Sequence, residues 1–334
     1  MTNQGILNNI VNQQAAFKSV FGTPNKAILN PEQAGRFLRV ATEQQLILRE
    51  ANVFTMKSHT KNLDRVSIEG RILTSGYDAD GVTRALDDDE KVGVSNFQNQ
   101  LVVKKLKTQA VIEDDELEDN IEGKAFANTL MDLQGEKIGY DMEAWAVWAN
   151  ATNILYAEDK LLNTTEGWLS KVGNKIYGVA GPGGDADFDP ADPESLFKAL
   201  IAALPKKYLR NRSMMRFYVP FEIEDAYRDI LADRGTALGD ATTTGYNGLA
   251  YRNIPVVNPD TLDDTVAENL WGTKAAMLQD PNNLQCGIWR QISMEPDRNP
   301  QLEQTEYVTT MRGDVHYTNQ FAGVAAFFDI ENPA

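Results

Sequence analysis

Cysteine is almost absent from this sequence. Only Cys286 carries a thiol, which excludes an intrachain disulfide and a metal site built from several thiolates. Histidine is nearly as scarce, and His59 and His316 lie far apart in the chain. No apolar run approaches the ~18 residues that a membrane-spanning helix needs, and the first residues do not form a basic-then-apolar leader. We therefore expect a cytosolic product with no membrane partner.

Basic side chains are also in short supply. The 334 residues include 48 Asp and Glu against 32 Lys and Arg, a formal net charge of −16. Such a surface repels polyanions, which argues against tight nucleic-acid binding over the whole protein. The apolar share of 42% and the aromatic share of 9% are nevertheless enough for a real hydrophobic core.

The usual catalytic signatures are missing as well. The sequence contains neither a GxSxG elbow nor a Walker or dinucleotide loop. Asp185, Asp187 and Asp189 begin like a calcium loop, but Pro190 and Leu196 stand where glycine and glutamate are required. The RGD tripeptide at 312–314 is read as chance. We predict no catalytic, cofactor-binding or metal-binding residue and no cofactor.

Helical patterns occur in four places. Asn30 and Pro31 can start a helix that continues towards residue 52, and 124–150 is the longest helical segment. Pro193 to Leu204 and Phe221 to Leu231 are two further helices, which alternate with strands at "MMRFYVP" and "RNIPVVNP". This order predicts a compact unit of helices and strands over about 165–270.

Two stretches before the long helix have strand character. "RVSIEGRIL" and "QLVVKKLKTQAVI" flank a polar, glycine-punctuated segment, and together they predict a long hairpin with a flexible tip. A hairpin of this length is marginal alone in water, so it needs a neighbouring surface. Its "KKLK" at 104–107 is interpreted as a charged strand edge.

Two more strands are expected near the end of the chain. In the first, Tyr307, Thr309 and Met311 alternate on one face, which is typical of a half-buried strand. In the second, 321–328 is apolar almost throughout and predicts burial on both faces. We expect these strands to form a closing pair.

The ordered set of segments resembles the major capsid proteins of tailed bacteriophages, whose shell fold is known from phage HK97. "KKLKTQAVIEDDELEDNIEG" is similar to the family's entry from the E-loop into the spine helix. "YVPFEIEDAYRDILADRG" with "GLAYRNIPVVNPDTL" resembles its A-domain, and "DPNNLQCGIWRQISMEPD" with the strands that follow resembles its closing section.

The resemblance implies an α+β fold in five parts. These are an N-terminal arm and helix (1–50), an E-loop hairpin (51–112), the first part of the P-domain with the spine helix (113–164), an inserted A-domain (165–272) and closing P-domain strands (273–334). It also implies a structural protein of the virion rather than an enzyme. Its subunits would self-assemble in the host cytoplasm into hexamers and pentamers of an icosahedral shell.

That shell would enclose double-stranded DNA without sequence-specific binding. The arm before the E-loop is too short to include a fused scaffolding domain, so a separate scaffolding protein is expected, together with a portal and an optional decoration protein. Lys57, Lys61 and Lys91 lie in or near the E-loop, but none matches the family's crosslinking lysine, and we predict no crosslink.

Two alternatives remain open from the sequence. An encapsulin-type nanocompartment shell would use the same fold around a cargo enzyme. A carboxylate-based hydrolase would use the acidic cluster between Glu113 and Asp119, including Asp114 and Asp115.

Overall fold

The structure is a computed structural model of the 334-residue chain. It describes residues 45–67, 73–77, 80–83, 85, 95–113, 126–179, 186–233, 248–289, 293–299 and 301–331. The predicted N-terminal arm, most of the helix predicted from Asn30, and the acidic residues 114–119 lie outside these ranges.

A five-stranded sheet forms one half of the molecule around its longest strand, β12 (Gln304–Tyr317). One edge of β12 pairs antiparallel with β4 (Lys104–Glu113). The other edge pairs with β11 (Ser293–Asn299) along its first half and with β10 (Leu284–Trp289) along its second. Strand β1 (Asn52–Met56) adds parallel to β10 and completes the sheet.

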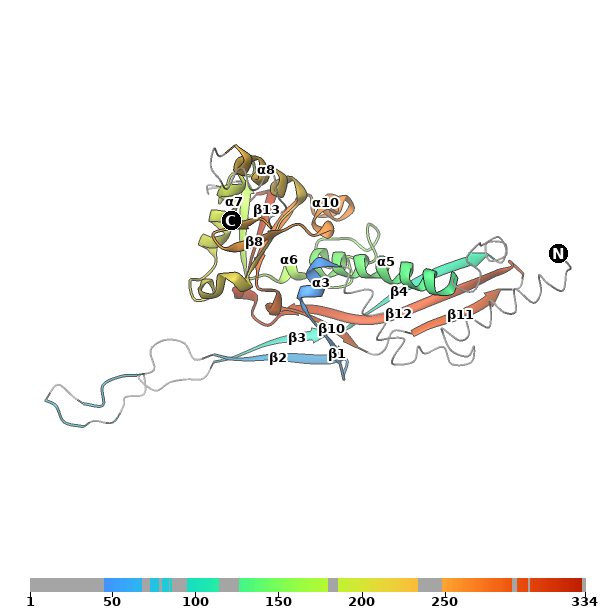
Figure 1. Cartoon of the computed structure of the whole chain (residues 1–334). Helices are drawn as coiled ribbons and strands as arrows, with labels where there is room; N and C mark the ends of the chain where they lie inside the picture. The colour runs from blue at the N-terminus through green and yellow to red at the C-terminus, as the bar shows by residue number, and fades with distance from the viewer. Residues whose placement is uncertain are drawn as a thin grey trace.

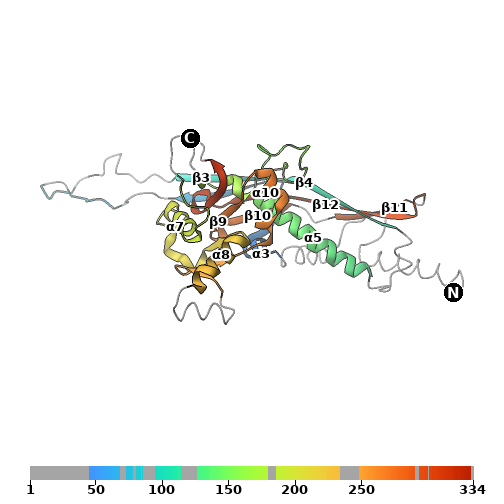
Figure 2. The ribbon, with the colours of Figure 1, turned by 90° about the horizontal axis from the view of Figure 1, so that it is seen from above.

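The spine helix α5 (Phe126–Trp148) runs beside this sheet (Figure 1). Its C-terminal half supplies Met142, Trp145 and Trp148 to a core shared with β10 and β12. Seen from above, α5 extends away from the other half of the molecule, which contains a six-stranded sheet (Figure 2). The helix predicted over 124–150 is therefore confirmed, and Leu133 in its N-terminal half is 59% exposed because it lies beyond this core.

A six-stranded sheet forms the other half. Its order is β5 (Asn174–Val179), β13 (Val324–Glu331), β9 (Ala275–Gln279), β6 (Arg216–Tyr218), β8 (Ile254–Val257) and β7 (Ala250–Tyr251). Helices α7 (Pro193–Ala203) and α8 (Phe221–Ala232) pack against it, as their amphipathic patterns predict. The Asp192 side chain accepts the Glu194 amide and starts α7, with Pro193 in its first turn.

Shorter helices connect these parts. They are α3 (Leu46–Glu50), α6 (Trp168–Lys171), α10 (Thr265–Trp271) and the 3-10 turns Leu209–Met214, Asp260–Asp263, Pro281–Asn283 and Gln320–Ala322. Gly272 ends α10 in the left-handed conformation at φ 69°, which a residue without Cβ adopts easily. None of the described helices is long and apolar enough to cross a membrane.

The last two strands have the burial that the sequence predicted. Tyr307, Thr309 and Met311 are all buried on one face of β12, and β13 is buried on both faces from Val324 to Phe328. The prediction that they form a closing pair is wrong. Strand β12 belongs to the five-stranded sheet, while β13 pairs with β5 and β9 in the other sheet.

The predicted hairpin is confirmed, but its second strand ends earlier than predicted, and residues 68–72 of its first predicted strand lie outside the described ranges. Strands β2 (Thr60–Ser67) and β3 (Ser95–Val102) pair antiparallel from Thr60 with Val102 to Ser67 with Ser95. The expected continuation of the second strand to Ile112 does not belong to the hairpin, since the chain leaves it at Val103 and β4 pairs with β12 instead.

The five-part division of the chain stays a prediction. Two strand pairings bear on where its boundaries would fall. β1 and all but the last residue of β4 fall in the range 51–112 and belong to the five-stranded sheet, and β9 and β13, inside 273–334, share a sheet with strands of 165–272.

Candidate assembly surfaces

The base of the hairpin is fastened by a buried carboxylate. Asp314 on β12 is 3% exposed, and its Oδ2 accepts the backbone N–H of Val102 at 2.7 Å. Its Oδ1 accepts Thr165 Oγ1 at 3.0 Å and lies 3.3 Å from Lys171 Nζ. Burial lowers the pKa of Lys171, and the charge of Asp314 acts against that shift. This network joins the hairpin, β12 and α6.

A small apolar cluster seals the same junction. Met56, Leu101 and Val103 are buried there, with Trp289 packed against them. Gly287 on β10 lies beneath, and a Cβ at that position would come 2.6 Å from Met56 Sδ. The glycine therefore permits the close approach of the hairpin to the sheet.

The paired strands of the hairpin carry mostly polar side chains. Gln98 Nε2 donates to Asp64 and Gln100 Nε2 donates to Asn62 across the two strands. The Lys61 ammonium lies 3.5 Å from the centre of the Phe54 ring. These contacts order β2 and β3, whose apolar packing lies at the base around Leu63 and Leu101, and the hairpin projects from the sheet (Figure 1).

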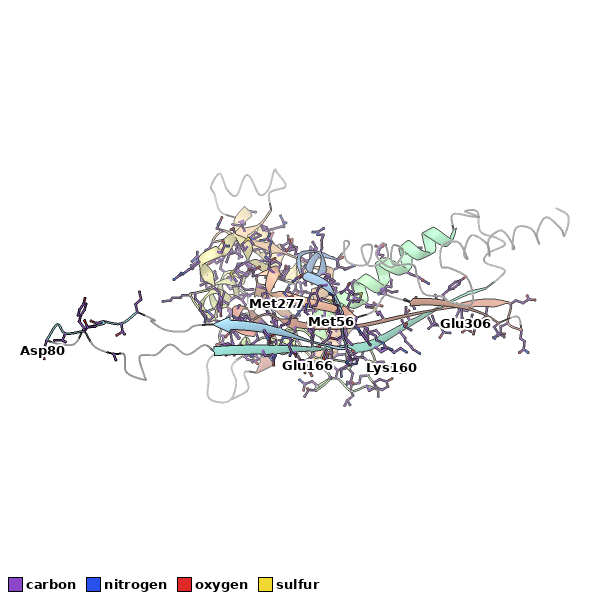
Figure 3. The ribbon with its side chains drawn as sticks, turned by 90° about the horizontal axis from the view of Figure 1, so that it is seen from below. Met56, Asp80, Lys160, Glu166, Met277 and Glu306 are labelled. Carbon is purple, nitrogen blue, oxygen red and sulfur yellow. The ribbon has the colours of Figure 1, made fainter. Side chains whose placement is uncertain are left out.

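Apolar side chains reappear near the tip, where they lie in solvent. Leu73, Tyr77 and Val82 are 89%, 63% and 61% exposed. Tyr77 and Thr83 form an isolated antiparallel bridge, and Gly81 adopts a positive φ of 78° between them. Figure 3 shows Asp80 at the far end of this segment, away from the rest of the side chains. Exposed apolar residues on a projecting segment are typical of a contact surface.

A second projecting loop follows the spine helix. Asn150 and Glu166 close it by an isolated bridge, and its interior is held by Asp159 Oδ1, which accepts the N–H groups of Leu161 and Leu162 at 2.7 Å. Outside, Leu155 and Tyr156 are each 63% exposed. A cavity of about 380 Å³ opens beside the loop, and its lining includes Lys175, Tyr177, Trp271 and Phe327.

A carboxylate in the spine helix fastens the segment that leads into β1. Glu143 is 1% exposed and accepts the N–H groups of Ile47 and Leu48 at 2.9 Å and the hydroxyl of Thr261 at 2.8 Å. Burial raises the pKa of Glu143, although these hydrogen bonds favour its charged form. At the other end of α3, Tyr218 OH donates to Glu50 at 3.0 Å.

The residues that the sequence singled out do not converge on a catalytic site. His59 packs edge-on against Trp289, and His316 lies on β12 with its pKa lowered by burial. Cys286 is buried in the core, which raises the pKa of its thiol to about 12. Lys57 and Lys61 lie beside the base of the hairpin, while Lys91, Asp114 and Asp115 lie outside the described ranges.

Two aspartates of the rejected calcium loop have structural uses, and the third, Asp185, lies outside the described ranges. Asp187 Oδ2 accepts the Tyr177 amide, and Asp189 Oδ1 accepts the Ala191 amide. Within the described parts of the chain, no cluster of three potential metal ligands occurs. The absence of metal-binding residues stays a prediction.

Sequence reasoning missed both buried carboxylates. Asp314 was read as part of a chance RGD tripeptide, yet it is the acceptor that fixes the hairpin. The residue spacing did not indicate that Asp314 is buried, because its side chain lies on the partly exposed face of β12. Glu143 did leave a signal, since an acidic residue interrupts the most apolar turn of the spine helix, between Met142 and Trp145.

A long helix beside a sheet, a projecting hairpin and a second sheet with two covering helices form the HK97-like fold that phage capsid proteins have. The chain superposes on a subunit of the satellite phage P4 procapsid with a TM-score of 0.64, 14% identity and 99% of each chain covered. A subunit of the empty GTA particle capsid gives 0.55 at 13% identity, covering 87% of this chain and 90% of the other.

A sequence relative agrees with the fold. The putative prophage capsid protein YqbE of Bacillus subtilis strain 168 is 29% identical over 293 residues, which are 86% of this chain and 88% of that protein. No known family profile matches the sequence. The predicted resemblance to phage capsid proteins and the α+β capsid fold are confirmed, and the relatives are structural proteins rather than enzymes, as expected.

Proposed function

We propose that the chain is the major shell subunit of a tailed phage and assembles into hexamers and pentamers of an icosahedral capsid around double-stranded DNA. The observation that carries the proposal is the hairpin. Its base is fixed by Asp314 and a sealed apolar cluster, while Leu73, Tyr77 and Val82 near its tip are in solvent. A rigid base with an apolar free end suits a contact with another subunit.

The mechanism is assembly rather than catalysis. Each hairpin lies across the next subunit, and the six-stranded halves of the subunits gather at the centre of a capsomer. Every contact is modest, but a subunit that makes several at once is held by their combined strength. The net charge of −16 suits a wall that contains DNA without binding it tightly.

The partners follow from the same role. A separate scaffolding protein, a portal and an optional decoration protein would join the shell, which forms in the host cytoplasm and ends in the virion. The relatives named above are phage, prophage and GTA capsids, which favours a phage shell over an encapsulin.

Negative-stain microscopy with light scattering on the full chain tests the proposal. We expect uniform shells tens of nanometres across, formed by the chain alone or with a scaffolding protein encoded beside it. A matched variant in which a Gly-Ser turn replaces residues 73–85 should stay folded and remain unassembled. The proposal is wrong if the intact chain stays monomeric at high concentration both alone and with the scaffolding protein.

A further inference from the structure

Acidic side chains are missing from one stretch of this acidic chain. Residues 195–221 contain no Asp or Glu, although the whole sequence has 48 of them and a net charge of −16. The cations of this stretch are Lys198, Lys206, Lys207, Arg210, Arg212 and Arg216. We call residues 206–212, which contain the four in the middle, the basic loop. The negative charge of the chain is interrupted there.

The basic loop is held in place by its uncharged residues. It leads from α7 towards β6 and includes most of the 3-10 turn between them. The Tyr208 hydroxyl accepts a hydrogen bond from Asn319 Nδ2, and Tyr208 and Leu209 pack against the core under α7 and α8. The Met215 N–H donates to the Arg212 carbonyl at 3.1 Å and ends the turn. The apolar residues turn inward, which leaves the charged side chains in solvent.

Three cations of the basic loop have no acidic partner. Lys206, Arg210 and Arg212 are exposed, and in the described parts of the chain none of them forms a salt bridge. Arg216, just after the loop, is different because its Nε lies 3.5 Å from Glu50 Oε2, which compensates its charge. The charges of the loop are therefore available to an anion from outside the subunit.

The Tyr208 hydroxyl responds to this positive charge. Burial acts to raise the pKa of this hydroxyl, but hydrogen bonds from Asn319, Arg65 and Lys207 and the charge of Lys207 hold the pKa below its usual value. The Lys207 ammonium lies 5.0 Å from the centre of the Tyr208 ring, and Arg65 comes from β2 of the hairpin. Negative charge is thus favoured beside the basic loop.

The composition of the basic loop fits duplex phosphates better than a protein or a single strand. Protein interfaces are depleted in lysine, whereas Lys and Arg are the residues that neutralise phosphates. A single strand is bound by exposed aromatic rings on which its bases stack. The one aromatic residue of the loop, Tyr208, is half-buried and hydrogen-bonded, so it offers no such platform.

Building on the proposed function, in which the shell encloses double-stranded DNA, we infer that the basic loop binds the phosphate backbone of that DNA without reading its sequence. Four cations make a weak contact in one subunit, and many subunits add their contacts along the same DNA. The acidic remainder of the surface repels the duplex, so the contacts are confined to the loops.

The salt dependence of DNA binding tests the inference. Fluorescence anisotropy of a labelled duplex of ~30 bp is measured with the full chain at ~25 to ~200 mM NaCl, below the protein concentration at which light scattering detects shells. The logarithm of the association constant should fall against log salt with a slope of about −3.6, since each of four neutralised phosphates contributes about −0.9. In K206Q/R210Q/R212Q the slope should become about −0.9, and the affinity at ~50 mM NaCl should fall by ~10-fold or more. Lys207 is kept because it contacts Tyr208.

Two matched variants separate the position of the charges from net charge and from folding. K137Q/K160Q/K175Q removes three exposed cations from other elements and should keep the wild-type affinity within ~2-fold. K206R/R210K/R212K keeps the charges and should keep the slope. All three variants should have the wild-type melting temperature, because the altered side chains are exposed.

The outcomes distinguish this inference from the proposed function. If wild type does not bind the duplex, or if K206Q/R210Q/R212Q binds it with wild-type affinity and slope, the inference is wrong, whether or not shells form. If wild type binds as expected but forms no shells alone or with a scaffolding protein, the proposed function fails and the phosphate-binding loop stands. Unchanged DNA binding with slower shell formation in K206Q/R210Q/R212Q would overturn the inference and assign the basic loop to an acidic protein surface.

Discussion

Strands β12 and β13 are neighbours in sequence but differ in what covers them. Strand β12 buries Tyr307, Thr309 and Met311 against the spine helix and leaves its alternate residues partly exposed. In β13, Ala325 and Phe327 join the spine-helix core, while Val324, Ala326 and Phe328 join the core under α7 and α8. The first strand thus has one buried and one partly exposed face, and the second separates two cores.

Truncating a buried side chain of β13 is the strongest test of this difference in burial between the two strands. Phe327 is 3% exposed and stacks on Tyr177 and on Trp271. Phe327→Ala should lower the free energy of unfolding by about 3–5 kcal/mol through lost burial and a cavity. Urea denaturation of the unassembled chain measures this change.

The matched control is a residue on the partly exposed face of β12. Val308 is half-buried, and Val308→Ala should cost about 1 kcal/mol or less. Equal losses in the two variants would show that β13 is not the more deeply packed strand.

A smaller change in the free energy of unfolding is expected at Glu143, through which the spine helix binds α3. Glu143 has a raised pKa because burial disfavours its charge, so its contribution to stability is greatest below its unfolded value of 4.5 and declines as the pH rises through the folded pKa. Glu143→Gln keeps an acceptor for Ile47 and Leu48 and a donor for Thr261, and removes the titration. At neutral pH the variant should lie within about 1 kcal/mol of wild type.

The pH dependence of the free energy of unfolding tests whether the raised pKa of Glu143 causes the difference between wild type and Glu143→Gln. Denaturation from pH 4.5 to 8 should show wild type losing stability relative to Glu143→Gln as the pH rises. Glu143→Leu, which leaves the two backbone N–H groups without their acceptor, should be less stable than the Gln variant at every pH. A constant difference between wild type and the Gln variant across this range would contradict the raised pKa.

Local sequence patterns predicted the strands and their burial better than they predicted which strands pair. The alternation in β12 and the apolar run in β13 each gave the correct burial, because side-chain period reports the faces of a single strand. Pairing depends on residues far away: β13 joins β5, about 150 residues earlier, and β9, about 50 residues earlier. "QLVVKKLKTQAVI" likewise reads as one strand, and only the contacts of Val102 with Asp314 and of β4 with β12 show that it bends at Val103.

The candidate surfaces show the same limit. The hairpin itself was predictable from its two strand patterns and the polar segment between them, whereas its anchoring carboxylate was not. Asp314 takes its role from Thr165 and Lys171, whose positions the topology alone brings beside β12. Buried polar networks are assembled from distant segments, so residue spacing along one strand cannot reveal them.

The smallest change in the free energy of unfolding is expected at the hairpin tip, whose exposed apolar residues contrast with the buried ones of β13. Leu73 and Tyr77 are as apolar as the residues of β13, but they are 89% and 63% exposed. Leu73→Ser/Tyr77→Ser should therefore change the free energy of unfolding of the free subunit by less than about 0.5 kcal/mol. The same variant should lose most of its shell formation in light scattering, since in the proposed shell these side chains become buried against a neighbour. A loss of stability like that of Phe327→Ala would mean that the tip packs within its own subunit, and unchanged assembly would mean that the tip is not a contact surface.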